Sequence, residues 1–168
     1  VANDATENFL YENDGQGRLT NIGMRSGVAM GQHGTPDGSM GVDATDFDGD
    51  GLPDIWVANY ENESFALYRN LGPGLFRHDS RAVGITALGG LYVGWGTAFF
   101  DFDYDGDEDV FVSNGHVIYF PLEAPLRQRP ILLENQDGEH FVNVVEQVGG
   151  YLAEQHMGRG AALGDMDD

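Results

Sequence analysis

The chain has 168 residues and a formal net charge of −20 at pH 7, from 28 acidic residues against 8 Lys and Arg residues. This charge argues against direct binding to nucleic acid or to an anionic membrane, and its self-repulsion destabilises a compact state unless a counter-charge such as a divalent cation offsets it. The absence of Cys excludes disulfides, thiolate metal sites and a Cys nucleophile, and no apolar run is long enough to span a bilayer.

The sequence repeats itself at an offset of 55 residues, and its first unit is incomplete. Residues 1–3 and 9–13 match the ends of two apolar runs that recur later in the chain, and each of these runs finishes in Asn. We therefore interpret residues 1–40 as the end of one repeat unit followed by a connection.

Residues 41–95 form the first complete unit. An acidic loop at residues 46–54 follows its first β-prone run, and Gly, Asn, Asp and Pro separate the later runs. The four runs lie at residues 41–45, 54–58, 65–68 and 75–78.

Residues 96–159 form the second complete unit, with an acidic loop at residues 101–109. The next copy of this loop begins 64 residues later, and we assign the excess length to an exposed, Pro-containing insertion at residues 121–130. Only residues 121–129, within this insertion, and residues 143–154 have a pattern that could hold a helical turn or two. Residues 160–168 begin a further unit, which is truncated within its acidic loop.

Four short strands that recur at this period predict an all-β fold of β-propeller blades, each a four-stranded antiparallel sheet. A β-sandwich shows no such self-similarity, and a solenoid of β-coils would need a shorter period. The chain holds about three blade equivalents, whereas a propeller needs at least about four blades to close. We therefore expect a partial propeller that belongs to a longer chain or associates tightly with other copies.

The acidic loops carry the most specific pattern in the sequence. Each has Asp at positions 1, 3, 5 and 9 and Gly at position 6. Alternate residues of a tightly curled loop point their carboxylates at one centre, and Ca²⁺ prefers roughly six to eight oxygen ligands, one of them here the backbone carbonyl of position 7. Mg²⁺ fits such all-protein cages poorly. The predicted ligands of two full Ca²⁺ sites are Asp46, Asp48, Asp50, Leu52, Asp54, Asp101, Asp103, Asp105, Asp107 and Asp109.

A third Ca²⁺ site is expected at Asp165 and Asp167 if further residues complete that loop. In contrast, we expect Asp79 to lie among turn residues outside any motif.

Two other interpretations of the loops fit less well. Acidic runs are usually solvated surface, yet 13 of the 28 acidic residues lie in the two loops and the truncated third, where close packing without a cation is repulsive. An EF-hand shares positions 1, 3, 5 and 6, but it requires Glu at position 12 and flanking helices. Position 12 is Val57 in one loop and Val112 in the other, and β-type sequence follows both.

The unit Gly-x4-Asp-x-Asp-x-Asp-Gly-x-x-Asp, followed by an apolar run and Asn, resembles the FG-GAP/VCBS repeat of integrin-α-type β-propellers. Its Phe-Gly and Gly-Ala-Pro signatures are degenerate here. Four short sequence segments resemble those of bacterial relatives of cartilage acidic protein, which carry ASPIC/UnbV domains, although no such domain is present. These segments are Val57-Ala-Asn59, Leu67-Tyr-Arg-Asn70, Gly94-Trp-Gly96 and Asn114-Gly-His-Val117. The resemblance implies Ca²⁺ in the hairpin loop between the first two strands of each blade, and an extracellular location.

The remaining residue patterns do not indicate an enzyme. The sequence has no nucleophile elbow, P-loop or dinucleotide fingerprint, and its five His lack zinc-site spacing. Carboxylates held on Ca²⁺ are also unavailable as proton donors for glycoside hydrolysis. His116 is the His that we single out as a candidate ligand residue. Six aromatic side chains could stack on carbohydrate, but we expect contacts between blades instead; they are Trp56, Tyr60, Tyr92, Trp95, Tyr104 and Tyr119.

We therefore expect a non-enzymatic calcium-binding β-propeller segment of an extracellular or cell-surface protein, secreted or periplasmic, that serves adhesion or protein assembly. Its expected partners are other protein chains or further copies of itself, with carbohydrate as a further candidate, no nucleic acid and no membrane insertion. Two alternatives stay open: a structural subunit of a surface filament or tube, and an accessory propeller of a polysaccharide-active enzyme.

Overall fold

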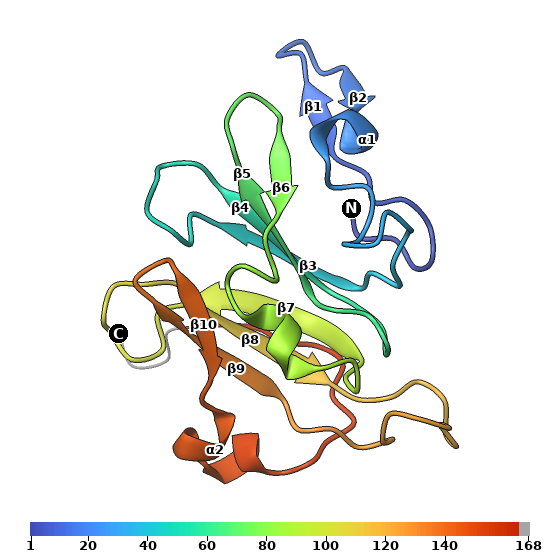
Figure 1. Cartoon of the computed structure of the whole chain (residues 1–168), viewed down its shortest axis with the longest axis vertical. Coiled ribbons are helices and arrows are strands. Elements are labelled where there is room, and N and C mark those ends of the chain that lie inside the picture. The colour runs from blue at the N-terminus through green and yellow to red at the C-terminus, as the bar shows by residue number, and fades with distance from the viewer. Residues whose placement is uncertain (165–168) are drawn as a thin grey trace.

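The computed structural model describes residues 1–164 and consists of three antiparallel sheets with a few short helices (Figure 1). This confirms the all-β fold class. Among the described residues, no helix is both long enough and apolar enough to cross a membrane.

The N-terminal part contains a two-stranded sheet and one helical turn. Strand β1 (Tyr11–Asn13) pairs with β2 (Leu19–Asn21), and helix α1 (Gly23–Ser26) follows at once. Helix α1 was not expected from the sequence pattern. The helix ends at Gly27, whose φ of 91° allows the left-handed C-terminal turn.

The first blade is a four-stranded meander in the order β3-β4-β5-β6. Its strands are β3 (Gly41–Thr45), β4 (Asp54–Ala58), β5 (Ala66–Asn70) and β6 (Phe76–His78). The first two strands have the bounds that the sequence predicts, and the last two differ from them by no more than two residues. The four-stranded blade is therefore confirmed.

The second blade repeats this order as β7-β8-β9-β10. Its strands are β7 (Gly94–Phe100), β8 (Asp109–Asn114), β9 (Ile131–Gln136) and β10 (His140–Asn143). The segment between β8 and β9 contains the insertion at residues 121–130, which forms bends and one isolated bridge but no helical turn. Short helices lie before and after this blade: η1 (Ile85–Leu88), α2 (Val145–Val148) and η2 (Gly150–Ala153).

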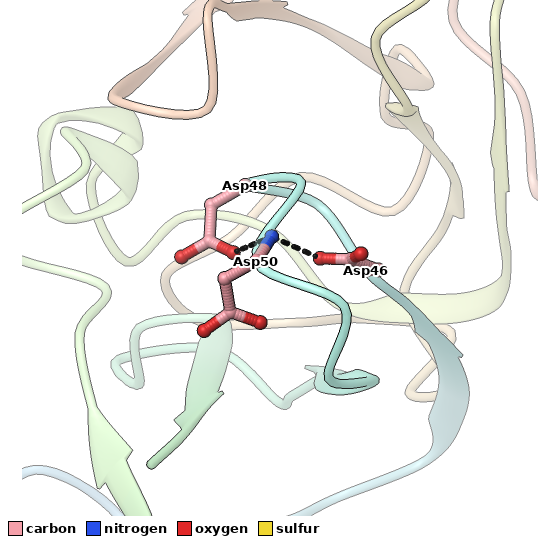
Figure 2. Close-up of side chains that lie close together, drawn as sticks. All are labelled: Asp46, Asp48 and Asp50. Carbon is pink, nitrogen blue, oxygen red and sulfur yellow. Dashed lines mark hydrogen bonds between the residues drawn. The ribbon is translucent and has the colours of Figure 1, made fainter. Parts of the chain in front are cut away.

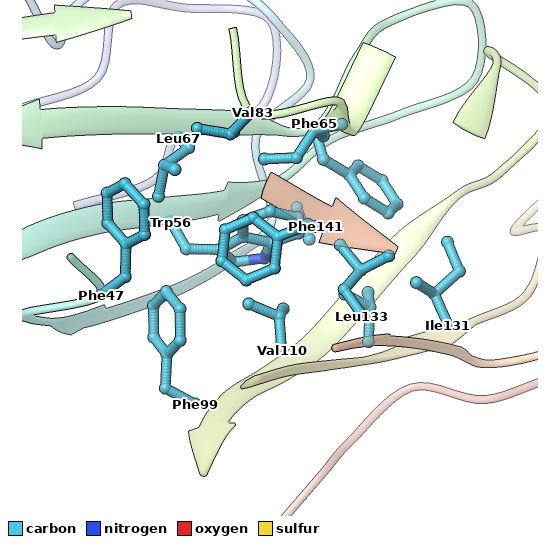
Figure 3. Close-up of a cluster of buried hydrophobic side chains, with 13 residues drawn as sticks. Phe47, Trp56, Phe65, Leu67, Val83, Phe99, Val110, Ile131, Leu133 and Phe141 are labelled. Atoms are coloured by element: carbon cyan, nitrogen blue, oxygen red, sulfur yellow. The ribbon is translucent and has the colours of Figure 1, made fainter. Parts of the chain in front are cut away.

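The main hydrophobic core lies between the two blades (Figure 3). Trp56 of the first blade is fully buried, and its ring meets Phe65 and Phe99 edge-on, with centroids 5.8 Å and 6.5 Å away. The second blade contributes Val110, Leu133 and other apolar side chains to the same cluster. Because apolar burial dominates folding free energy, this shared core fixes the blades against each other.

The opposite faces of the two blades differ. The N-terminal part covers the first blade, where Val28 packs with Val57 and Tyr68 in a second buried cluster. The opposite face of the second blade carries an apolar groove instead, which is lined by residues that include Phe100, Phe102, Phe111, Leu132, Leu152 and Leu163.

The aromatic residues divide between core and surface. The expected packing between blades is confirmed for Trp56, and Tyr92 lies partly buried against the same core. The expectation is wrong for Tyr104 and Tyr119, whose exposed fractions are 92% and 70%. Both belong to connecting loops rather than to a strand that faces the neighbouring blade.

Candidate metal sites

The two acidic loops occupy the same place in each blade. The first aspartate loop (residues 46–54) joins β3 to β4, and the second aspartate loop (residues 101–109) joins β7 to β8. In both hairpins the last strand residue before the loop pairs with the Asp at position 9. The sequence repeat is therefore a repeat of structure, with each loop in the hairpin between the first two strands.

The Asp at position 1 organises each loop by accepting two backbone amides. In the first loop, the Asp46 carboxylate accepts the amides of Asp50 and Gly51 at 3.0 Å and 2.8 Å. In the second loop, Asp101 accepts the amides of positions 5 and 6 at 3.1 Å each. These bonds curl the loop back on its first residue and bring the later carboxylates towards it.

The curl requires left-handed backbone at two positions. Gly51 and Gly106, at position 6, have φ of 88° and 101°, which explains why Gly stands there in both loops. Position 4 is also left-handed, with φ of 70° at Gly49 and 63° at Tyr104. Tyr104 therefore carries a backbone strain that Gly49 avoids.

The Asp at position 9 is buried and ties its loop to the next strand. Asp54 accepts the amides of Phe47 at 3.2 Å and Asn70 at 2.7 Å, while Asp109 accepts those of Phe102 at 2.9 Å and Asn135 at 2.7 Å. Each of these two residues is 1% exposed. Burial raises the pKa of Asp54 to about 6 and raises that of Asp109 above its ordinary value. A nearby cation would favour the ionised form of both groups.

Carboxylates gather in each loop as a metal site would require. One oxygen from each of Asp46, Asp48 and Asp50 lies within 4.8 Å of the others, and Figure 2 shows these three side chains around the amide of Asp50. In the second loop, the corresponding group within 4.8 Å contains position 9 instead of position 5: Asp101, Asp103 and Asp109. Each loop therefore supplies at least three carboxylates to one small volume.

The remaining predicted ligands have other described contacts. Asp105 accepts the amide of Asp107 at 2.9 Å, and Asp50 likewise accepts the amide of Leu52 at 2.8 Å. The side chain of Asp107 accepts the amide of Asp137 at 2.9 Å. Metal coordination by the carbonyls at position 7 stays a prediction. Asp165 and Asp167 lie outside the described residues.

An arginine lies beside the first loop. Arg69 of β5 donates a hydrogen bond to Asp48, donates a second one to Asp79 at 2.8 Å, and places its guanidinium 4.7 Å from the ring centre of Phe47. Arg77 also binds Asp79, and these bonds hold the pKa of Asp79 below its ordinary value. Asp79 lies next to turn residues and outside the aspartate loops, as expected, but it is 5% exposed and anchors the arginine beside the first loop.

Among residues 1–164, the position beside the second loop that matches Arg69 holds an acid. Arg69 directly precedes Asn70, and the residue that directly precedes the matching Asn135 is Glu134. The two candidate sites therefore differ in the charge of one neighbouring strand residue, which is positive beside the first loop and negative beside the second. The aligned repeats contain this difference, so the sequence carried the signal that could have identified Arg69.

The first loop also contributes to the contact between blades. The Asn135 side chain donates to the backbone carbonyl of Phe47 at 2.8 Å. A Cβ added to Gly138, in the β9–β10 turn, would lie only 2.7 Å from the Cα of Asp48. A cation in the first loop would therefore stabilise a surface against which the second blade packs.

His116 is a structural residue rather than part of a ligand cluster. Its side chain is 0% exposed, its Nδ1 accepts the amide of Ile118 at 2.9 Å, and its Nε2 lies 3.1 Å from Glu61 and 3.4 Å from the hydroxyl of Tyr60. Both ring nitrogens have partners within the protein, so nothing in this geometry points to a ligand.

Comparison with known proteins identifies the repeat. No curated protein matches the sequence. The family model for the FG-GAP-like repeat matches residues 1–57 and residues 46–112, so the two matches together span 112 of the 168 residues. The more specific likeness to ASPIC/UnbV proteins stays a prediction. The recurring blade, the hairpin loops and the family match agree, and the chain belongs to the FG-GAP-like repeat family.

Proposed function

We propose that this chain is a non-enzymatic, Ca²⁺-binding propeller segment of an extracellular or cell-surface protein, and that it serves adhesion or protein assembly. The observation that carries the proposal is the twofold occurrence of one loop geometry, in which at least three carboxylates converge. An accidental acidic cluster would not repeat the same pattern of backbone hydrogen bonds at positions 1, 5, 6 and 9.

The donor set fits Ca²⁺ better than the other common metals. Every candidate ligand is an oxygen, which suits a hard cation, and neither group of carboxylates includes a His. Asp46, Asp48 and Asp50 would hold one ion, and Asp101, Asp103 and Asp109 would hold the other. Mg²⁺ dehydrates reluctantly and demands a stricter octahedron, which an adaptable loop of this kind does not impose.

The role that we assign to Ca²⁺ is structural. A ligand that binds only the folded state stabilises it by about 2.7 kcal/mol at a hundredfold excess over Kd. Two ions would also reduce the formal charge from −20 to −16 and relieve repulsion within both loops. Because the first loop touches the second blade, its ion would stabilise the contact between blades as well as one hairpin.

An extracellular setting is supported by the family, because FG-GAP repeats typically occur in extracellular proteins, where Ca²⁺ is plentiful. The part in assembly is supported by the apolar groove on the second blade, whose lining includes Phe100, Phe111 and Leu132. A further blade, from the same chain or from another chain, would bury this surface.

Thermal unfolding with and without chelator tests the proposal. We expect Ca²⁺ to raise the melting temperature of the chain, and each loop variant, Asp46→Asn with Asp48→Asn or Asp101→Asn with Asp103→Asn, to lose part of that increase. The matched control is Glu139→Gln, which removes an exposed acid outside both loops. The proposal would be contradicted if Ca²⁺ did not change the melting temperature. It would also be contradicted if Ca²⁺ still raised the melting temperature fully in both pairs of loop substitutions.

A further inference from the structure

The segment that enters the insertion carries a run of exposed apolar side chains. Residues 117–122, Val-Ile-Tyr-Phe-Pro-Leu, are here called the apolar tip. Phe120 is 82% exposed and Leu122 is 99% exposed, and their neighbours Val117, Ile118 and Tyr119 are exposed as well. Single exposed apolar residues are ordinary, but a contiguous group of this kind indicates an interaction surface.

Hydrogen bonds to the rest of the fold hold both ends of this tip in place. On its N-terminal side lies the buried His116, whose Nδ1 holds the amide of Ile118 and whose Nε2 meets Glu61. On its C-terminal side, the other oxygen of Glu61 accepts the amide of the buried Ala124 at 3.0 Å, and Asn62 donates to Glu123 at 2.7 Å. The β4–β5 loop therefore contacts the residues at both ends of the tip. The fold itself holds the tip in its exposed position.

The side chains of the tip are apolar except for the hydroxyl of Tyr119. Tyr119 and Phe120 contact each other edge-on, with ring centres 5.2 Å apart, and no charged side chain lies within residues 117–122. An element that docks in a protein groove keeps one face towards solvent, and that face is usually polar. A projection without a charged face is better satisfied at a lipid interface, where the amphipathic ring of a Tyr is also favourable.

The charge around the tip allows contact with such an interface. Glu61 and Glu123 at the base of the tip are balanced by Arg127 and Arg129, a net of zero in a chain of net −20. In Figure 1 the yellow-orange insertion projects to the right, whereas the teal and yellow aspartate loops lie at the left end of the sheets. The densest negative charge is therefore at the end of the blades away from the tip.

We propose that the apolar tip inserts into the interfacial layer of a neutral, zwitterionic lipid surface. The irregular backbone of the tip needs hydrogen-bonding water, so insertion stops at the headgroup boundary and does not reach across the hydrocarbon. The sequence-based expectation of no membrane insertion rested on net charge, which argues against anionic lipids, and on the lack of an apolar run long enough to span a bilayer, which shallow insertion does not require. The proposal does not depend on Ca²⁺ in either loop.

Flotation of the chain with phosphatidylcholine vesicles tests this proposal. We expect wild-type protein to float with the vesicles, and the pair Phe120→Ser and Leu122→Ser to lower the partition coefficient by about tenfold or more, because both side chains enter the interface. Both residues are exposed, so circular dichroism should show an unchanged fold. The control pair is Leu19→Ser and Met24→Ser, which removes two exposed apolar side chains elsewhere and should leave flotation unchanged.

Changes in salt and in lipid charge distinguish apolar insertion from electrostatic binding to the vesicles. We expect flotation to be insensitive to salt and weaker when phosphatidylglycerol replaces part of the phosphatidylcholine. Wild-type protein that does not float overturns the proposal, as does flotation that the tip substitutions leave unchanged. Self-association that the tip substitutions abolish, without any vesicle binding, would overturn it in favour of a protein contact at the same residues.

Discussion

Arg69 donates a hydrogen bond to Asp48, and so a strand of the first blade supplies a cation to its own aspartate loop. Arg69 is held there by Asp79, which is 5% exposed and also binds Arg77. The second blade has Glu134 at the position of Arg69. The two loops share a backbone geometry but not an electrostatic setting.

We predict that Arg69→Gln strengthens Ca²⁺ binding at the first loop. The guanidinium competes with the ion for Asp48, and removing it should lower the Kd of this site by about fivefold, or roughly 1 kcal/mol. Titration calorimetry should use protein that also carries Asp101→Asn, so that the first site is measured alone. The control is Arg18→Gln, which removes an exposed arginine far from the loop. Weaker or unchanged binding in Arg69→Gln would show that the arginine does not compete.

Asp109→Asn should destabilise the protein even without Ca²⁺. The carboxylate accepts two amides, and the amide group of Asn can accept only one of them, so the free energy of unfolding should fall by about 1–3 kcal/mol. Urea unfolding in chelator measures this effect, with Glu139→Gln as the control. If Asp109 served only as a metal ligand, the variant and the wild type would be equally stable in chelator.

Gly138→Ala should weaken the contact between blades. Its backbone has φ of 71°, and a Cβ would lie 2.7 Å from the Cα of Asp48. Gly72→Ala is a matched control, because its φ is 92° but no atom lies within 4 Å of the added Cβ. Both variants carry the left-handed backbone penalty, so Gly138→Ala should cost about 1–3 kcal/mol more from overpacking alone. If urea unfolding showed the same decrease in the free energy of unfolding for both variants, the β9–β10 turn would not pack closely against the first loop.

His78 gives the stability a dependence on pH. Its ring packs edge-on against Tyr68, and burial lowers its pKa below the ordinary value of 6.5. The folded protein therefore favours neutral His78, and the contribution of this residue is complete above pH 6.5 and decreases as the pH falls through the folded pKa. Relative to His78→Phe, wild-type protein should lose stability as the pH falls below 6.5. Parallel pH profiles of the two proteins would rule out this role.

The sequence was sufficient to predict the blade and the place of its aspartate loops. Two copies of one motif could be aligned, and their alternation of β-prone runs with turn residues located β3 and β4 to the residue. Backbone preferences and spacing are local properties, and repetition confirmed them within a single chain.

Contacts between distant segments were harder to predict. Asp79 lies ten residues from Arg69 in sequence and seemed to be an ordinary turn acid, because its partner is known only once β5 and β6 pair. The exposure of Leu122 agrees with the predicted exposed insertion, but that of Phe120 was not predicted, since composition alone cannot tell an apolar core segment from an apolar projection. Helix α1 is a single turn and too short to show periodicity.

The most direct test of the central claim is the number of Ca²⁺ ions that one folded chain binds. Equilibrium dialysis of metal-free protein, followed by elemental analysis, should give two ions per chain for the two described loops. The pair Asp101→Asn and Asp103→Asn should reduce this number to one, while Glu139→Gln should leave it at two. A chain that binds no Ca²⁺, or one whose stoichiometry is unaffected by loss of the second loop, would contradict the account.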